Sequence, residues 1–69
     1  MHLKIVVNGK PREAADGLTV AALIAELGIT APRVAVERNM DIVDRERFAD
    51  TVLAENDQVE IIHFVGGGA

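Results

Sequence analysis

The 69-residue sequence has no cysteine, tryptophan or tyrosine and only two phenylalanines. Without cysteine, the chain forms neither a disulfide nor a thioester on a sulfur of its own, and a thiol nucleophile is excluded. Basic residues are also few, since 7 Lys and Arg stand against 11 Asp and Glu for a formal net charge of −4. A phosphate-backbone partner needs a clustered basic surface, so the composition argues against nucleic acid and favours a basic protein partner.

Other absences exclude further classes of function and location. No apolar run approaches the roughly 20 residues that cross a bilayer, and residues 1–8 lack the basic flank and cleavage site of a secretory signal. We therefore expect a cytoplasmic protein with no membrane partner. His2 and His63 have no neighbouring ligands at short spacing, so no metal site is predicted. Four acidic residues between positions 37 and 46 lack an apolar pocket that would tune an acid/base pair, so no catalytic residue is predicted either.

The first half of the chain predicts a hairpin followed by a helix. Apolar residues alternate with polar ones over residues 3–8, and Asn8-Gly9 is typical of a tight turn. The return strand is expected over residues 12–15, at a sheet edge because Pro11 lacks a backbone N–H. Thr19 is placed as an N-cap and Gly28 as the residue that ends the helix. Between them, the apolar residues with helical spacing are Val20, Leu23, Ile24 and Leu27.

The second half predicts short strands around Asn39, a turn at residues 55–57, and a last strand over residues 59–65. This last strand is apolar on both faces at Ile61 and Ile62, so we expect it in the middle of the sheet, covered by the helix. The order of elements predicts an α+β protein with a ubiquitin-like β-grasp fold: a mixed four- to five-stranded sheet with one main helix across one face. The domain is expected to span residues 1–65, with a flexible C-terminal tail over 66–69.

The tail Gly66-Gly67-Gly68-Ala69 is a candidate functional segment, and a glycine-rich terminus is by itself a weak motif. Glycine is the thinnest residue, so this segment can thread a narrow channel and present a terminal carboxylate inside another protein's active site. The alternative is an end that frays without a role. A domain whose tail enters another protein also needs a surface that this protein recognises, and the apolar candidates for that interface are Met40, Ile62, Phe64 and Val65. For Ile62, burial in the core fits the sequence equally well.

Several segments together resemble the ThiS family, the sulfur carriers of thiamin thiazole biosynthesis. The resemblance covers essentially the entire chain and combines a central Glu-Arg-Asn segment with a Gly-rich end at the expected length. The segments that carry it are Val36-Glu37-Arg38-Asn39, residues 42–48, residues 57–61, and His63-Phe64-Val65-Gly66-Gly67-Gly68.

The resemblance implies a cycle in which other proteins do the chemistry. A ThiF-like enzyme would use ATP to adenylate the terminal glycine carboxylate, a persulfide donor would supply sulfur to form a thiocarboxylate, and a ThiG-like thiazole synthase would receive that sulfur. The chain itself would be a carrier and not an enzyme, with no bound cofactor, and we expect it to be a monomer on its own.

The sequence departs from the family pattern at its end, where Ala69 follows Gly68. Either a peptidase removes Ala69 and exposes Gly68, or the activating enzyme tolerates an alanine carboxylate. We favour removal, which makes Gly68 the site of adenylation and thiocarboxylation. Two other functions stay open at this point. One is a carrier like the small subunit of molybdopterin synthase, and the other is a ubiquitin-like modifier or interaction domain.

Overall fold

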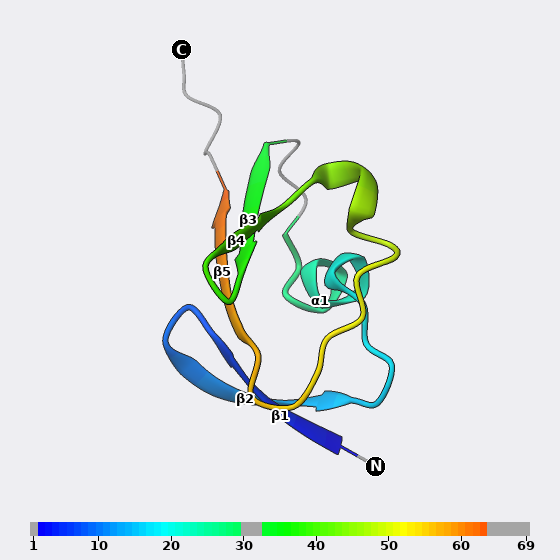
Figure 1. The fold of residues 1–69 in the computed structure, drawn as a ribbon, viewed down its shortest axis with the longest axis vertical. Coiled ribbons are helices and arrows are strands. Elements are labelled where there is room, and N and C mark those ends of the chain that lie inside the picture. The colour runs from blue at the N-terminus through cyan, green and yellow to red at the C-terminus, as the bar shows by residue number, and fades with distance from the viewer. Residues whose placement is uncertain (1, 30–32, 64–69) are drawn as a thin grey trace.

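The computed structural model describes residues 2–29 and 33–63, and within them five strands form one mixed sheet with a helix across one face (Figure 1). The elements are β1 (His2–Val7), β2 (Lys10–Ala15), α1 (Val20–Glu26), β3 (Val34–Arg38), β4 (Asp41–Val43), the 3-10 helix η1 (Arg45–Arg47) and β5 (Gln58–His63). The strand order is β2-β1-β5-β3-β4, with β1 and β5 parallel and the other neighbours antiparallel. The predicted α+β ubiquitin-like β-grasp class is therefore confirmed, as is the central place of the last strand.

The β1–β2 hairpin turns at Asn8 and Gly9, which have φ angles of 51° and 82°. Both residue types adopt this left-handed region more readily than others, so the turn forms where the sequence predicts it. The return strand begins at Lys10 rather than at residue 12, and Pro11 lies inside it, opposite Val6. Because β2 is an edge strand, the missing N–H of Pro11 costs no bond to a neighbouring strand on the outer side.

Helix α1 is bounded by the two residues that the sequence indicates. The Thr19 hydroxyl accepts a hydrogen bond from the Ala22 N–H at 3.1 Å, which caps the helix at its start. Gly28 has a φ of 72° and ends the helix in the left-handed conformation. With 7 residues, α1 is slightly shorter than predicted because Leu27 already serves as its C-cap.

The core lies between α1 and the face of the sheet that α1 covers. Its largest fully buried side chains are Ile5, Val20, Leu23, Val36 and Val59. Burying each aliphatic side chain of this size contributes about 1.5–3 kcal/mol, which makes this layer the main source of stability. Of the two alternatives that the sequence left open for Ile62, exposure is the one observed, because successive residues of β5 point to opposite faces and Ile62 is 52% exposed.

The other face of the sheet carries Ile62 and is called here the open face. Residues opposite each other in neighbouring strands share a face, so the register assigns a set from three strands to it. These residues are Ala35 and Glu37 of β3, Ile42 of β4, and Glu60 and Ile62 of β5. Helix α1 packs on the opposite side of the sheet (Figure 1).

Candidate functional site

The predicted reactive end lies outside the described residues. Gly66, Gly67 and Gly68 fall there, as do the predicted interface residues Phe64 and Val65 and the domain boundary at residue 65. The structure does describe where the tail is attached. Strand β5 ends at His63, which pairs with Val34 of β3, so the tail continues from the central strand of the sheet.

The two predicted interface residues that the structure describes are both accessible to a partner. Met40 is 88% exposed and Ile62 is 52% exposed. Ile42, which the sequence analysis did not select, is 74% exposed and lies with Ile62 on the open face. The signal was available, because adjacent apolar residues in a strand point to opposite faces, and Val43 takes the inward position. Exposed aliphatic side chains that gather on one face of a sheet are typical of a protein interface.

Two carboxylates lie next to Ile42 and Ile62 on the open face. Glu37 of β3 and Glu60 of β5 are directly opposite each other in the antiparallel register, so both side chains are on the open face. Like charges at directly opposed positions destabilise a sheet, since the side chains are within about 5 Å of each other. A basic group from a partner would relieve this repulsion. The pair therefore agrees with the acidic composition in favouring a basic protein partner.

The β3–β4 turn that presents Met40 is held by a buried carboxylate. Asp57 is only 5% exposed, and its two oxygens accept three hydrogen bonds. Arg38 donates through Nε at 2.7 Å, the Ala54 N–H donates at 2.8 Å, and the Asn39 side-chain amide donates at 3.0 Å. The sequence analysis assigned residues 55–57 to a turn and missed this role, because a polar turn residue carries no sign of burial.

Asn39 extends the network to β5 and fixes the turn. Its side-chain oxygen accepts from the Gln58 N–H at 3.0 Å, while its own N–H donates to the Gln58 carbonyl at 2.7 Å. Asn39 and Met40 both have positive φ, 52° and 74°, as a two-residue turn between strands requires. Methionine does not favour this conformation, and the bonds of Asn39 hold it in place.

The pKa of Asp57 reflects the same contacts. Burial would by itself raise the pKa of this carboxyl, but the three hydrogen bonds that it accepts and the nearby guanidinium charge outweigh burial. The pKa is therefore below its ordinary value, and Asp57 is an anion at neutral pH. This carboxylate is used structurally, since its lone pairs are directed at fixed donors.

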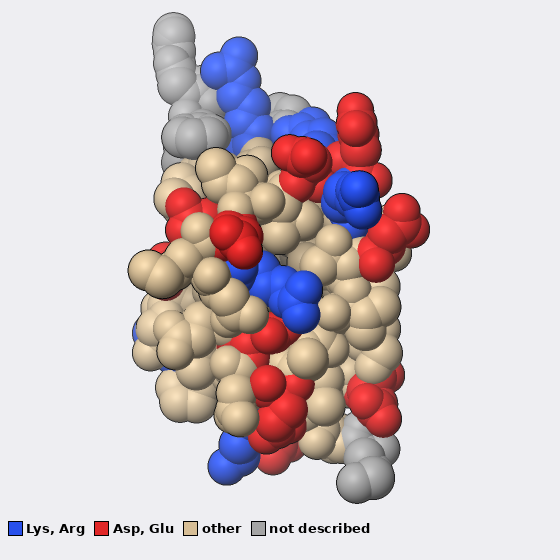
Figure 2. Space-filling view, in the orientation of Figure 1, with Lys and Arg blue, Asp and Glu red and all other residues tan. Residues whose placement is uncertain are grey.

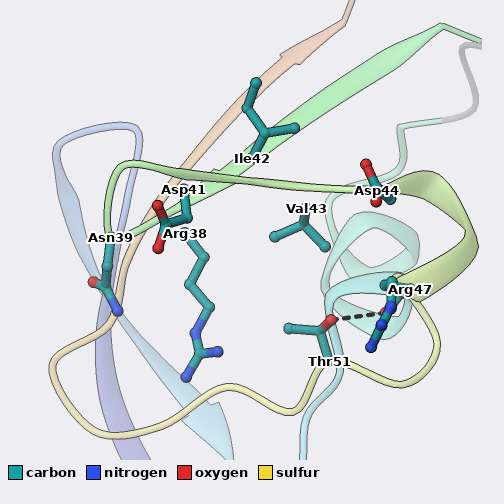
Figure 3. Close-up of a pocket in the computed structure, with 8 residues that line it drawn as sticks. All are labelled: Arg38, Asn39, Asp41, Ile42, Val43, Asp44, Arg47 and Thr51. Carbon is teal, nitrogen blue, oxygen red and sulfur yellow. Dashed lines mark hydrogen bonds between the residues drawn. The ribbon is translucent and has the colours of Figure 1, made fainter.

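A shallow hollow of about 470 Å³ lies between the β3–β4 hairpin and η1 (Figure 3). Arg38 reaches into it, whereas Ile42 leaves the hairpin in the opposite direction toward the open face. Two arginines and two aspartates line the hollow, so its formal charges balance. Figure 2 likewise shows basic and acidic side chains interspersed over the visible surface. The hollow offers neither a nucleophile next to a base nor an apolar pocket around an acid.

The part of the chain that the structure describes contains no group of three or more His, Cys, Asp or Glu side chains that could hold a metal ion. Over the same residues, no helix is long and apolar enough to cross a membrane.

Comparisons with known proteins agree with this picture. The model of the ThiS family matches residues 5–68. The sulfur carrier protein ThiS of Bacillus subtilis is 40% identical over 63 residues, which cover 90% of this chain and 96% of that protein. The crystal structure of a thiamine biosynthesis protein (ThiS) from Geobacter metallireducens superposes with a TM-score of 0.81 at 38% identity, covering 96% of this chain and all of that one.

Longer relatives also match. A thiazole synthase of Magnetococcus marinus is 46% identical over 66 residues, and one of Paramagnetospirillum magneticum is 42% identical over 67 residues. The match spans nearly this whole chain but only about a fifth of those two proteins, 20% and 21% of their lengths.

The mixed five-stranded sheet, the single helix across it and the exposed second face define the class as a ubiquitin-like β-grasp domain. The family match over residues 5–68 and the close, nearly full-length similarity to curated carriers make the assignment specific: the chain belongs to the ThiS family. Of the functions left open by the sequence, the sulfur carrier of thiamin biosynthesis is the one that this membership supports.

Proposed function

We propose that this domain is a cytoplasmic carrier that holds sulfur as a thiocarboxylate on Gly68 and delivers it for thiazole formation. The observation that carries the proposal is the family match, which reaches Gly68 and leaves Ala69 outside. Bound cofactors are not required, because ATP is used by the activating enzyme. The domain acts as a monomer that visits its partners in turn.

The chemistry explains why the carboxylate must be activated. Resonance and negative charge make a carboxylate carbon a poor electrophile, and adenylation removes both protections while pyrophosphate leaves from ATP. A persulfide sulfur then attacks the carbonyl carbon and AMP leaves. Reduction of the remaining S–S bond by a thiol gives the thiocarboxylate, a soft nucleophile suited to sulfur transfer.

Two partners follow from this cycle, a ThiF-like adenylating enzyme and a ThiG-like thiazole synthase, with a persulfide donor between them. The thiazole synthase is supported by the two relatives that carry this name and match nearly all of this chain. The open face supports recognition, because the exposed Ile42 and Ile62 lie next to the opposed Glu37 and Glu60. We expect the partner to place a basic group between these carboxylates and apolar side chains around it.

Replacing Ile62 by Ala is expected to weaken binding to the activating enzyme about tenfold or more, because an interface isoleucine loses its contact area. The free energy of unfolding should change by less than about 1 kcal/mol, since the side chain is half exposed. Val52→Ala is the matched control. Val52 is also 52% exposed but pairs with Thr19 beside α1, away from the open face. Calorimetry and thermal melts measure both quantities, and equal affinities of the two variants would contradict an interface at Ile62.

Removing Ala69 is expected to speed adenylation, because the methyl group of an alanine carboxylate would crowd a channel that fits glycine. The test incubates the full chain and a chain ending at Gly68 with the activating enzyme and ATP, and follows the acyl-adenylate by mass. Equal rates for the two chains would mean that Ala69 need not be trimmed.

A further inference from the structure

A second hollow, of about 460 Å³, lies on the helix side of the sheet, between the β1–β2 turn, the end of α1 and the end of β5. Its apolar lining includes Leu27, Ile29 and Ile61, and three basic side chains complete it: Lys10, Arg12 and His63. This volume falls within the range of small-molecule sites. Neither the carrier chemistry nor the open face uses this hollow.

Two walls of this hollow are fixed by hydrogen bonds. Asn8, in the β1–β2 turn, accepts from the Ile61 N–H at 2.7 Å and donates to the Ile61 carbonyl at 3.3 Å, which ties the turn to β5. At the end of α1, the Gly28 N–H bonds to the Ala25 carbonyl at 3.0 Å and the Ile29 N–H bonds to the Ile24 carbonyl at 3.2 Å. This pair of bonds directs Ile29 back toward the sheet. The shape is therefore set without a ligand.

The charge of the hollow is opposite to that of the protein. The chain has a formal net charge of −4, yet the side chains of Lys10 and His63 make no hydrogen bond or ion pair with any residue that the structure describes. Arg12 bonds through Nη2 to Glu26 at 3.1 Å, and its Nε is buried with no acceptor among the described residues. A buried guanidinium N–H without an acceptor costs free energy that a small rotation toward an anion would recover.

We propose that this hollow, defined by Lys10, Arg12 and His63 over Leu27, Ile29 and Ile61, binds a small organic anion, a carboxylate or phosphate monoester with an apolar body. The basic side chains bind the charged head, and the aliphatic ones pack against the body. Lys10 is opposite Val7 on the helix side, so an anion bound here leaves the open face free for a protein partner.

The site can be tested on the chain alone, independently of sulfur transfer. Titration with inorganic phosphate, phenyl phosphate and benzoate is followed by amide chemical shifts. We expect shifts confined to residues 8–12, 27–29 and 61–63, and phenyl phosphate to bind at least about tenfold more tightly than inorganic phosphate because its ring is removed from water. Comparison of phenyl phosphate with benzoate distinguishes phosphate from carboxylate as the preferred head.

Lys10→Gln is expected to weaken phenyl phosphate binding at least about fivefold, because a charge-assisted contact is lost. Lys4→Gln is the matched control. Lys4, in β1, is exposed like Lys10, but its side chain is on the other face of the sheet. Thermal melts verify that both variants fold. Equal affinity for inorganic phosphate and phenyl phosphate, shifts spread over the whole surface, or an equal loss in both variants would each overturn the proposal.

Discussion

A chain shortened by Gly67, Gly68 and Ala69 is expected to be inert toward its activating enzyme while its fold is unchanged. Activation requires the terminal carboxylate to reach an ATP site inside another protein, and a shorter tail holds that carboxylate several ångströms short. A displacement of this size removes the geometric advantage of a bound reactant, so the rate of adenylation should fall at least about a hundredfold. The core is untouched, because its buried residues lie between Ile5 and Ile61.

Intact mass measures this prediction directly. The chain that ends at Gly68 should gain the mass difference between sulfur and oxygen when it is incubated with the activating enzyme, ATP and a persulfide donor, and the chain that ends at Gly66 should not. The chain that ends at Gly68 is the control, because its terminal carboxylate lies on the residue that is proposed to be activated. If a thiocarboxylate formed on the shortened chain at the rate of the control, activation would not depend on the length of the tail, and the prediction would be wrong.

The second large effect concerns stability. Asp57→Ala is expected to lower the free energy of unfolding by about 3 kcal/mol, because three hydrogen bonds to a buried charge are lost and the donors of Arg38 and Asn39 are left without their acceptor. A domain of this length has only about 3–10 kcal/mol of stability in total, so the loss is severe. Urea denaturation measures it.

Asp50→Ala provides the matched control, since this exposed aspartate should contribute less than about 0.5 kcal/mol. The pH dependence gives a second measurement. The folded pKa of Asp57 is below the value of about 3.9 in the unfolded chain, so its stabilising contribution is present above that pH and is lost as the pH falls through the folded pKa. The difference between the wild-type chain and Asp57→Ala should therefore be constant near neutral pH and shrink in acid. A difference that stays constant down to pH values of about 2 would contradict the assignment.

The sequence predicted the β-grasp order because the strongest local signals agree with the tertiary structure. The boundaries of these elements are set by backbone conformation or capping, and the structure has them where the sequence predicts them. Asn8-Gly9 forms the turn of the hairpin, Thr19 caps the start of α1, and Gly28 ends it. For Ile62 the sequence could not decide between an interface and the core, because adjacent isoleucines in a strand fit both a buried strand and one with a free face.

The burial of Asp57 was also beyond the sequence. Its partners Arg38 and Asn39 are 19 and 18 residues away, and only the pairing of β3 with β5 brings them together. The Arg38-Asn39 segment carried the family resemblance without a stated role, and the structure gives it one: it joins the hairpin that presents Met40 to the loop before β5. For the tail, the sequence suggested a role from its glycine content, but the tail lies outside the described residues, so this role stays a prediction.

The position of β5 has a mechanical consequence. An enzyme that draws the tail into its channel pulls on the end of a strand that is paired on both sides, to β1 and to β3. Hydrogen bonds between strands run across the direction of such a pull, so they must break in shear and together rather than one after another, as they would at an edge strand. The tail is thus attached to the strand that resists such a pull more strongly than an edge strand would.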